Sequence, residues 1–134
     1  MDGADITMQC QVVTGEQMIG TVDLRYTDPS MGVMTGYMIP NSNYTEEIRK
    51  AAQAFTALQL NDISWDEYGP ILKAMGWRIQ LMDARIVPNL WIALSDWSYI
   101  HEDETRIEVT ICGTNPDQLR DWLAGKIDLP EHLE

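Results

Sequence analysis

Apolar residues recur at every second position through much of the first 40 residues, which is the period of β-strands that bury one face. The runs Ile6–Val12 and Val22–Tyr26 flank a turn at residues 14–17 and predict a hairpin. A third run, Val33–Ile39, follows an Asp-Pro-Ser sequence at residues 28–30 that is typical of a type I turn. We therefore expect a meander of three strands at the start of the chain.

The third strand raises a question, because one of its faces carries only Met34, Gly36 and Met38. If an alanine-rich helix covers this face, Gly36 is the point where that helix approaches the strand. If the face is exposed, its methionines form an adaptable binding surface. We expect the covered arrangement.

The clearest helix spans Thr45–Leu58, where apolar residues follow a period of 3.6 residues. Glutamates at positions 46 and 47 lie in its first turn, where the helix dipole favours negative charge. The apolar stripe of this helix consists of Ile48, Ala51, Ala52, Phe55 and Leu58. Because alanines dominate the stripe, the helix can approach a sheet closely.

A second helical segment begins at Ser64, which forms a capping-box pattern with Glu67. Proline beyond the first turn removes a backbone donor and disfavours a continuous helix. We therefore expect Pro70 to divide this segment into one turn at Trp65–Tyr68 and a short helix at Pro70–Met75.

The last half of the chain returns to strand patterns and ends in a helix. The predicted strands are Trp77–Leu81, Leu90–Trp97 and Arg106–Cys112. Asn115 followed by Pro116 is a typical helix start, and the apolar spacing continues to Leu123. Trp77 and Trp122 fall on the apolar faces of these elements, so we expect both in the core.

The order ββ(β)–αα–βββ–α predicts the α+β class. We expect an antiparallel sheet of about five to six strands with the helices packed on one face. A length of 134 residues is typical of one domain, so residues 1–134 are assigned to a single domain.

The opening sequence MDGADITMQC lacks the basic residues of a signal peptide, and no apolar run approaches the ~20 residues that span a bilayer. We therefore expect a cytoplasmic protein. In that compartment Cys10 and Cys112 are expected to be reduced thiols of the core rather than a disulfide.

The net charge of −12 limits the choice of partners. Nucleic-acid binders gain affinity by neutralising phosphates with Lys and Arg, and anionic membranes attract basic surfaces. Neither partner is expected here. A strongly acidic chain is soluble, and it can also attract a basic protein over a long range.

The densest negative charge lies at residues 101–104, in a segment that also contains two aromatic residues. Three interpretations compete: a solvated hairpin loop, a metal site that includes His101, and an acidic patch with aromatic anchors. A metal site is disfavoured because one His beside carboxylates matches no recognised ligand spacing. The candidate partner-binding residues are Asp96, Trp97, Tyr99, Glu102, Asp103 and Glu104.

Motifs for catalysis and cofactor binding are absent from the sequence. It has no P-loop, CxxC, HExxH or GxSxG motif, and its two histidines, His101 and His132, have no spacing to a nucleophile that suggests a catalytic triad. Paired carboxylates carry no specificity among 21 acidic residues. We expect no catalytic residues, no cofactor and no metal.

These observations lead to one hypothesis and two alternatives. The leading hypothesis is a non-enzymatic acidic protein of the immunity-protein or inhibitor type, bacterial or phage-encoded, that neutralises a basic partner such as a toxin or nuclease. The first alternative is a small enzyme or ligand-binding domain with a pocket between sheet and helices, in which Asp83, Asp96 or His101 would lie in a cleft with a perturbed pKa. The second alternative is a structural subunit of a phage or other assembly.

Overall fold

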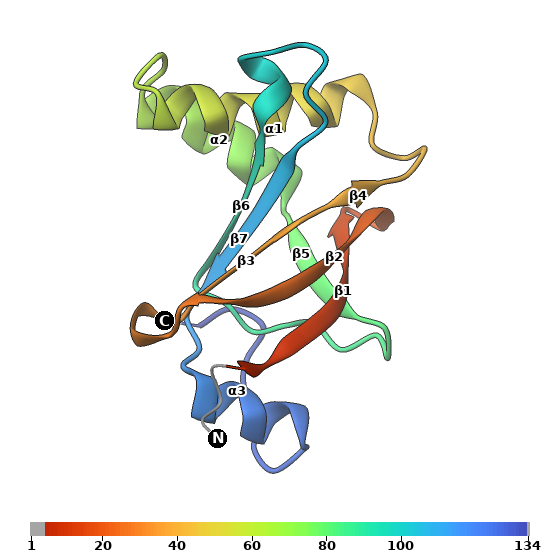
Figure 1. Ribbon diagram of the computed structural model, residues 1–134, viewed down its shortest axis with the longest axis vertical. Coiled ribbons are helices and arrows are strands. Elements are labelled where there is room, and N and C mark those ends of the chain that lie inside the picture. The colour runs from red at the N-terminus through yellow and green to blue at the C-terminus, as the bar shows by residue number, and fades with distance from the viewer. Residues whose placement is uncertain (1–4, 134) are drawn as a thin grey trace.

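The structure, a computed structural model that describes residues 5–133, has the expected α+β class (Figure 1). Its strands are β1 (Thr7–Thr14), β2 (Gln17–Asp28), β3 (Val33–Tyr37), β4 (Ile39–Pro40), β5 (Arg78–Leu81), β6 (Trp91–Asp96) and β7 (Ile107–Cys112). Its helices are α1 (Glu46–Gln59), α2 (Trp65–Met75) and α3 (Pro116–Leu123), with short 3-10 turns η2 (Pro29–Met31) and η3 (Trp97–Tyr99).

One curled antiparallel sheet contains all these strands, in the order β5-β1-β2-β3-β7-β6, with β4 beside β2. The count exceeds the expected five to six because β3 and β4 are two parts of one line along β2. Arg25 faces Thr35 and Thr21 faces Ile39, so the register continues across the interruption between them.

Gly36 lies in β3, between the two stretches of this line that pair with β2. A Cβ atom on Gly36 would overlap the carbonyl oxygen of Asp23 in β2, and one on Gly20 would lie 2.6 Å from the carbonyl oxygen of Ile39. The expectation that Gly36 marks the approach of a helix is therefore wrong: the close neighbour is another strand of the same sheet. The missing side chains let the neighbouring strands come close at these two positions.

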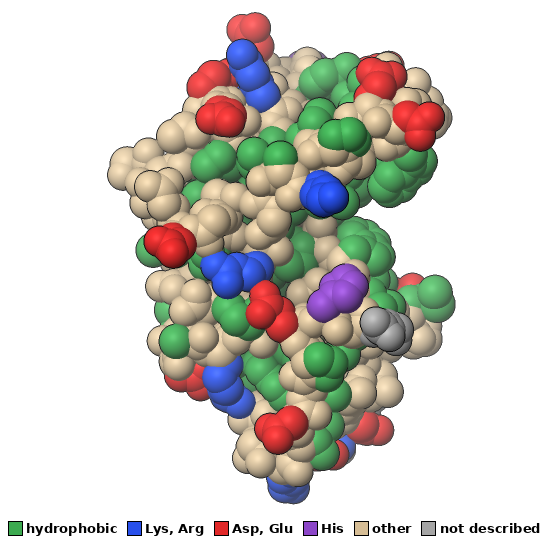
Figure 2. All heavy atoms as spheres, turned by 180° about the vertical axis from the view of Figure 1, so that it is seen from behind, with side chains coloured by type: hydrophobic (Ala, Val, Ile, Leu, Met, Phe, Trp, Pro, Cys, Tyr) green, Lys and Arg blue, Asp and Glu red, His purple; other side chains and the backbone are tan. Residues whose placement is uncertain are grey.

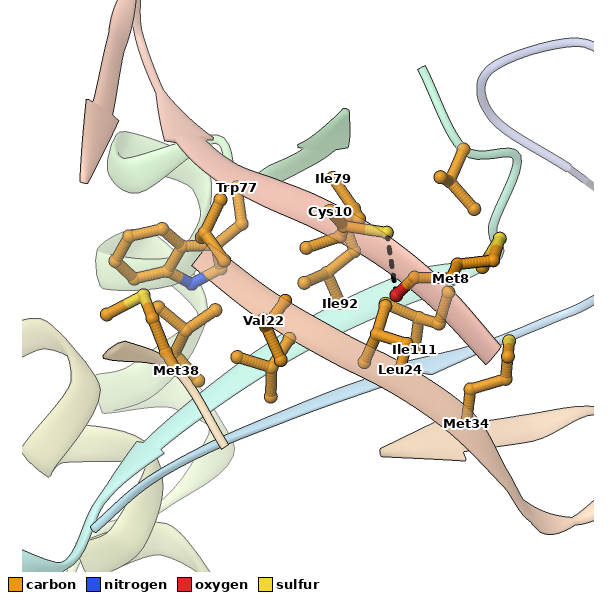
Figure 3. Packing of buried hydrophobic residues seen from close by; sticks show 14 of the residues in the cluster. Met8, Cys10, Val22, Leu24, Met34, Met38, Trp77, Ile79, Ile92 and Ile111 are labelled. Atoms are coloured by element: carbon orange, nitrogen blue, oxygen red, sulfur yellow. Dashed lines mark hydrogen bonds between the residues drawn. The ribbon is translucent and has the colours of Figure 1, made fainter. Parts of the chain in front are cut away.

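The curl encloses a single hydrophobic cluster. Figure 3 shows residues of β1, β2, β3, β5, β6 and β7 directed into this core. Met34 is 0% and Met38 is 3% exposed, so the methionine face of the third strand is covered. Trp77 and Trp122 also belong to the core, as predicted.

The helices lie at two ends of the molecule rather than in one layer (Figure 1). Helix α1 begins after the cap residue Thr45 and packs along β6, an edge strand. Helix α3 lies at the opposite end, where the Arg85 guanidinium donates to the carbonyl oxygen of Trp122 at 3.1 Å and stacks on its ring. Helix α1 thus covers the β6 edge of the sheet, and α2 packs against α1.

Helix α2 differs from the prediction, because it is continuous from Trp65 to Met75 and contains Pro70. As expected, the helix begins with a capping box at Ser64 and ends at Gly76, which has a left-handed backbone conformation. Pro70 is exposed and follows a glycine, so its ring meets no Cβ on the preceding residue. The backbone bond that it lacks would go to Asp66, an exposed residue of the first turn, where water can replace it.

Candidate partner-binding site

The predicted acidic segment begins at Asp96, whose side chain lies inside the protein. Asp96 is 2% exposed. Its carboxylate accepts hydrogen bonds from the Ser98 N–H at 2.9 Å, the Ser98 hydroxyl at 2.5 Å and the Tyr44 hydroxyl at 2.5 Å. Asp96 caps η3 and fixes the start of the acidic loop, so it does not present its charge to a partner.

A network of polar side chains joins α1 to β6 and η3 around Asp96. Thr56 donates its hydroxyl to the Asp96 carbonyl at 2.9 Å, and the Ser95 hydroxyl donates to Gln59 at 2.9 Å. Gln53 donates to the Ser98 hydroxyl at 3.0 Å. Because burial and the neighbouring Asp96 carboxylate oppose ionisation, the pKa of Tyr44 is raised well above its ordinary value. Every group in this network has a structural partner, as in a joint between elements.

Trp97 and Arg106 form a second fixed part of the loop. The Arg106 guanidinium lies 4.6 Å from the centre of the Trp97 ring and pairs with Glu104 at 3.2 Å. Trp97 is half-buried, and within residues 5–133 its indole Nε1 has no hydrogen-bond partner. The Trp97 ring is therefore covered by the Arg106 guanidinium, and the same guanidinium partly neutralises the charge of Glu104.

The remaining candidate residues are at the surface. Glu102 and Asp103 are exposed, and Tyr99 is 41% exposed. The Tyr99 hydroxyl donates to Asp62 at 2.8 Å, and this bond to a carboxylate raises the pKa of Tyr99. Of the six candidates, Tyr99, Glu102 and Asp103 are thus placed to meet a partner directly. The Tyr99–Asp62 bond also ties the acidic loop to the turn between α1 and α2.

An apolar groove that the sequence did not reveal lies between α1, α2 and the start of β6. Its volume is about 470 Å³, within the range of ligand pockets in proteins. It is lined by Phe55, Leu58, Gln59, Trp65, Tyr68, Leu72, Trp91, Ile92 and Ala93. Figure 2 shows a notch in the molecular surface with hydrophobic side chains on both sides.

Two tryptophans flank the groove at its opposite walls. Trp65 on α2 is 67% exposed, and Trp91 at the start of β6 is 45% exposed. Trp65, Tyr68 and Leu72 lie on one face of α2 because their spacing follows the helical period. That spacing was the one feature of the sequence that pointed to this wall of the groove. The opposite wall comes from β6, which begins 16 residues after the end of α2, and no local pattern connects this strand to the helix.

Charged residues also lie near the α2 wall of the groove. Asp62 lies in the turn before α2, and Asp66 lies in its first turn. Lys73 follows the lining residue Leu72 and is also exposed. The Tyr99–Asp62 bond connects the acidic loop to the turn from which this wall begins.

The groups proposed for the enzymatic alternative, Asp83, Asp96 and His101, are not among the residues that line the groove. Asp83 is exposed, and hydrogen bonds from the Arg85 backbone and side chain lower its pKa. His101 is exposed as well. Burial and the charge of Asp23 raise the pKa of the Cys10 thiol to about 12, and burial raises the pKa of Cys112. Both cysteines are free thiols that stay protonated near neutral pH.

Within residues 5–133, no group of three or more His, Cys, Asp or Glu side chains is arranged to hold a metal ion. In the same part of the chain, no helix is long and apolar enough to cross a membrane. No protein-family model matches the sequence, and neither curated proteins nor solved structures gave a match.

Proposed function

We propose that this protein binds a basic protein partner and blocks its activity, as an immunity protein or inhibitor does in the cytoplasm. The observation that carries the proposal is an apolar groove with two exposed tryptophans in a chain of net charge −12. Charge complementarity accelerates association, whereas buried aromatic residues supply most of the affinity at interfaces. The Tyr99–Asp62 bond connects the acidic loop to the turn before α2, the helix that supplies one wall of the groove.

The contact surface that we propose differs from the residues predicted from the sequence. Tyr99, Glu102 and Asp103 remain in it as exposed residues. Asp96, Trp97 and Glu104 support it from beneath, through the η3 cap and the Arg106 stack. Trp65 and Trp91 are added as the residues that a partner would bury.

The test begins with affinity capture of the partner from the native host, followed by association kinetics with the purified partner. Trp65→Ala and Trp91→Ala should each weaken binding by about 2 kcal/mol, mainly through faster dissociation. Ile39→Ala is the matched control, because Ile39 is 72% exposed on β4 and lies outside the groove. Equal affinities for all three variants would contradict the proposed contact surface.

Charge reversal tests whether the acidic residues accelerate association with the partner. Glu102→Lys together with Asp103→Lys should reduce the association rate, and the difference from the wild type should shrink as salt screens the charges. An association rate that is independent of salt would mean that the acidic surface does not steer the partner.

A small apolar ligand is the second candidate for the groove, favoured by its size and its nearly complete apolar lining. Thermal-shift measurements with aromatic and long-chain aliphatic compounds test this function. A compound that raises the melting temperature of the wild type but not of Trp65→Ala, in the absence of any protein partner, would favour it.

A further inference from the structure

We infer that the groove receives an amphipathic helix of the partner, with apolar residues at positions i, i+4 and i+7 and Lys or Arg along its flanks. This inference rests on the proposed function and names the form of the contact. Three features carry it: the length of the groove, the closed edge of β6, and the charges beside α2.

The length of the groove matches two turns of a helix. Its lining residues on α2 run from Trp65 to Leu72, a separation of seven residues and about 10 Å along the helix axis. On α1 the lining residues are Phe55, Leu58 and Gln59, which occupy the last turn. Residues i and i+7 of a second helix are separated by the same distance, and such spacings are how apolar grooves recognise helices.

A strand is a poorer occupant, because the edge of β6 beside the groove is closed. The Asp96 carbonyl points away from β7 and accepts from Thr56 on α1, whereas the next residue, Trp97, directs its N–H to Arg106 on the β7 side. In this antiparallel pairing, alternate residues direct their backbone groups away from β7, and these include Ile92 and Leu94. Ile92 is 7% and Leu94 is 0% exposed, so their backbone groups are covered. A partner therefore meets side chains here rather than a free backbone edge.

The charges beside the groove select a basic helix. Asp66 and Lys73 are seven residues apart on α2, so they lie on the same flank of the helix at its two ends. Asp62, in the turn before α2, adds a second carboxylate at the Asp66 end. Two carboxylates against one lysine, in a chain of net charge −12, favour a ligand helix whose flanks carry Lys or Arg.

Synthetic peptides test the inference on the full-length protein. The probe is an 18-residue capped peptide with Leu at i, i+4 and i+7 and Lys on both flanks. One control has the same composition with the leucines spread around the helix, and another has Pro at its centre. We expect the probe to bind at least tenfold more tightly than either control, and its circular dichroism to show helix formation on binding.

Variants of the protein test whether the peptide binds in the groove. Trp65→Ala and Trp91→Ala should each weaken probe binding by about tenfold or more, whereas Ile39→Ala should leave it unchanged. Asp66→Lys should weaken binding of the basic probe, and Lys73→Glu should strengthen it. A probe in which Glu replaces Lys should reverse the order of these two variants.

The outcomes separate this inference from the proposed function. Equal binding of the helical and Pro-containing peptides, or binding that ignores both tryptophans, overturns the helix inference. Failure of all peptides overturns it too, and the proposed function still stands if a captured basic partner loses affinity in Trp65→Ala. If the affinity for the captured partner is unchanged in both tryptophan variants, the groove is not its binding site, and the helix inference and the proposed contact surface both fail.

Discussion

At the scale of single residues, Gly36 allows β3 to approach β2 closely. The backbone of β3 approaches β2 so closely at this point that no Cβ atom fits beside the Asp23 carbonyl. The flanking residues Met34 and Met38 are buried in the core, so the strand cannot move outward without exposing them. The glycine is therefore required by the neighbouring strand and not by an unusual φ angle.

We predict that Gly36→Ala lowers the free energy of unfolding by about 2–4 kcal/mol, because the backbone of β2 or β3 must shift to admit the methyl group. Gly69→Ala is the control. No atom lies within 4 Å of a Cβ at Gly69, and the helix-propensity gain there is opposed by the following Pro70, so its effect should stay within about 1 kcal/mol. Urea denaturation compares the stabilities of the two variants. Equal values would show that β3 does not approach β2 closely at Gly36.

At the scale of elements, the joint between α1 and the β6–η3 segment is polar where most contacts of the core are apolar. Tyr44, in the loop before α1, donates to the buried Asp96 carboxylate, and Thr56 in the last turn of α1 donates to the Asp96 carbonyl. Directional bonds fix the position of α1 along β6 more narrowly than apolar packing alone would. The joint thereby holds one wall of the groove and the start of the acidic loop in place.

We predict that Tyr44→Phe lowers the free energy of unfolding by about 1.5–3 kcal/mol, because it removes a hydrogen bond to a buried charged group. Tyr99→Phe loses a similar bond to the exposed Asp62 and should cost less than about 1 kcal/mol. Chemical denaturation of the two variants tests the difference. Similar losses would indicate that water reaches Asp96 and replaces the missing hydroxyl.

At the scale of the whole molecule, several buried groups hold their protons more tightly in the folded chain than in the unfolded chain. Burial raises the pKa of Cys10 from 9.0 to about 12 and that of Tyr68 from 10.0 to about 12. The pKa values of Tyr26 and Tyr44 are raised as well, mainly by burial. These groups stabilise the fold fully below the pKa of the unfolded chain and lose that contribution as pH rises.

We therefore predict that the free energy of unfolding falls above about pH 9, where Cys10 ionises in the unfolded chain. The fall should become steeper above about pH 10, where the tyrosines of the unfolded chain ionise as well. Each such group lowers the free energy of unfolding by about 1.4 kcal/mol per pH unit within its window. Urea midpoints measured from pH 7 to pH 11 test this prediction. Cys10→Ala should flatten the first part of the decline; an unchanged slope between pH 9 and 10 would contradict the role of the thiol.

The sequence predicted the fold class well because the period of apolar residues is a local property. The 2-residue period of Arg106–Cys112 and the helical stripe of Thr45–Leu58 each depend only on neighbours along the chain. Pro70 misled the prediction, because a local rule about proline was outweighed by a strong cap at Ser64 and by packing. In the acidic loop, charge density indicated a surface segment but could not show that Asp96 points inward.

What the sequence determined by itself was therefore the set of elements, their caps, and the negative charge that limits the choice of partners. What only the tertiary structure decided was which residues meet. The groove brings Trp65 and Trp91 together from segments 26 positions apart, and Gly36 faces Asp23 across two strands. Such contacts depend on how the sheet curls and where α1 crosses its edge. Both follow from packing the whole core at once, which no short stretch of the sequence encodes.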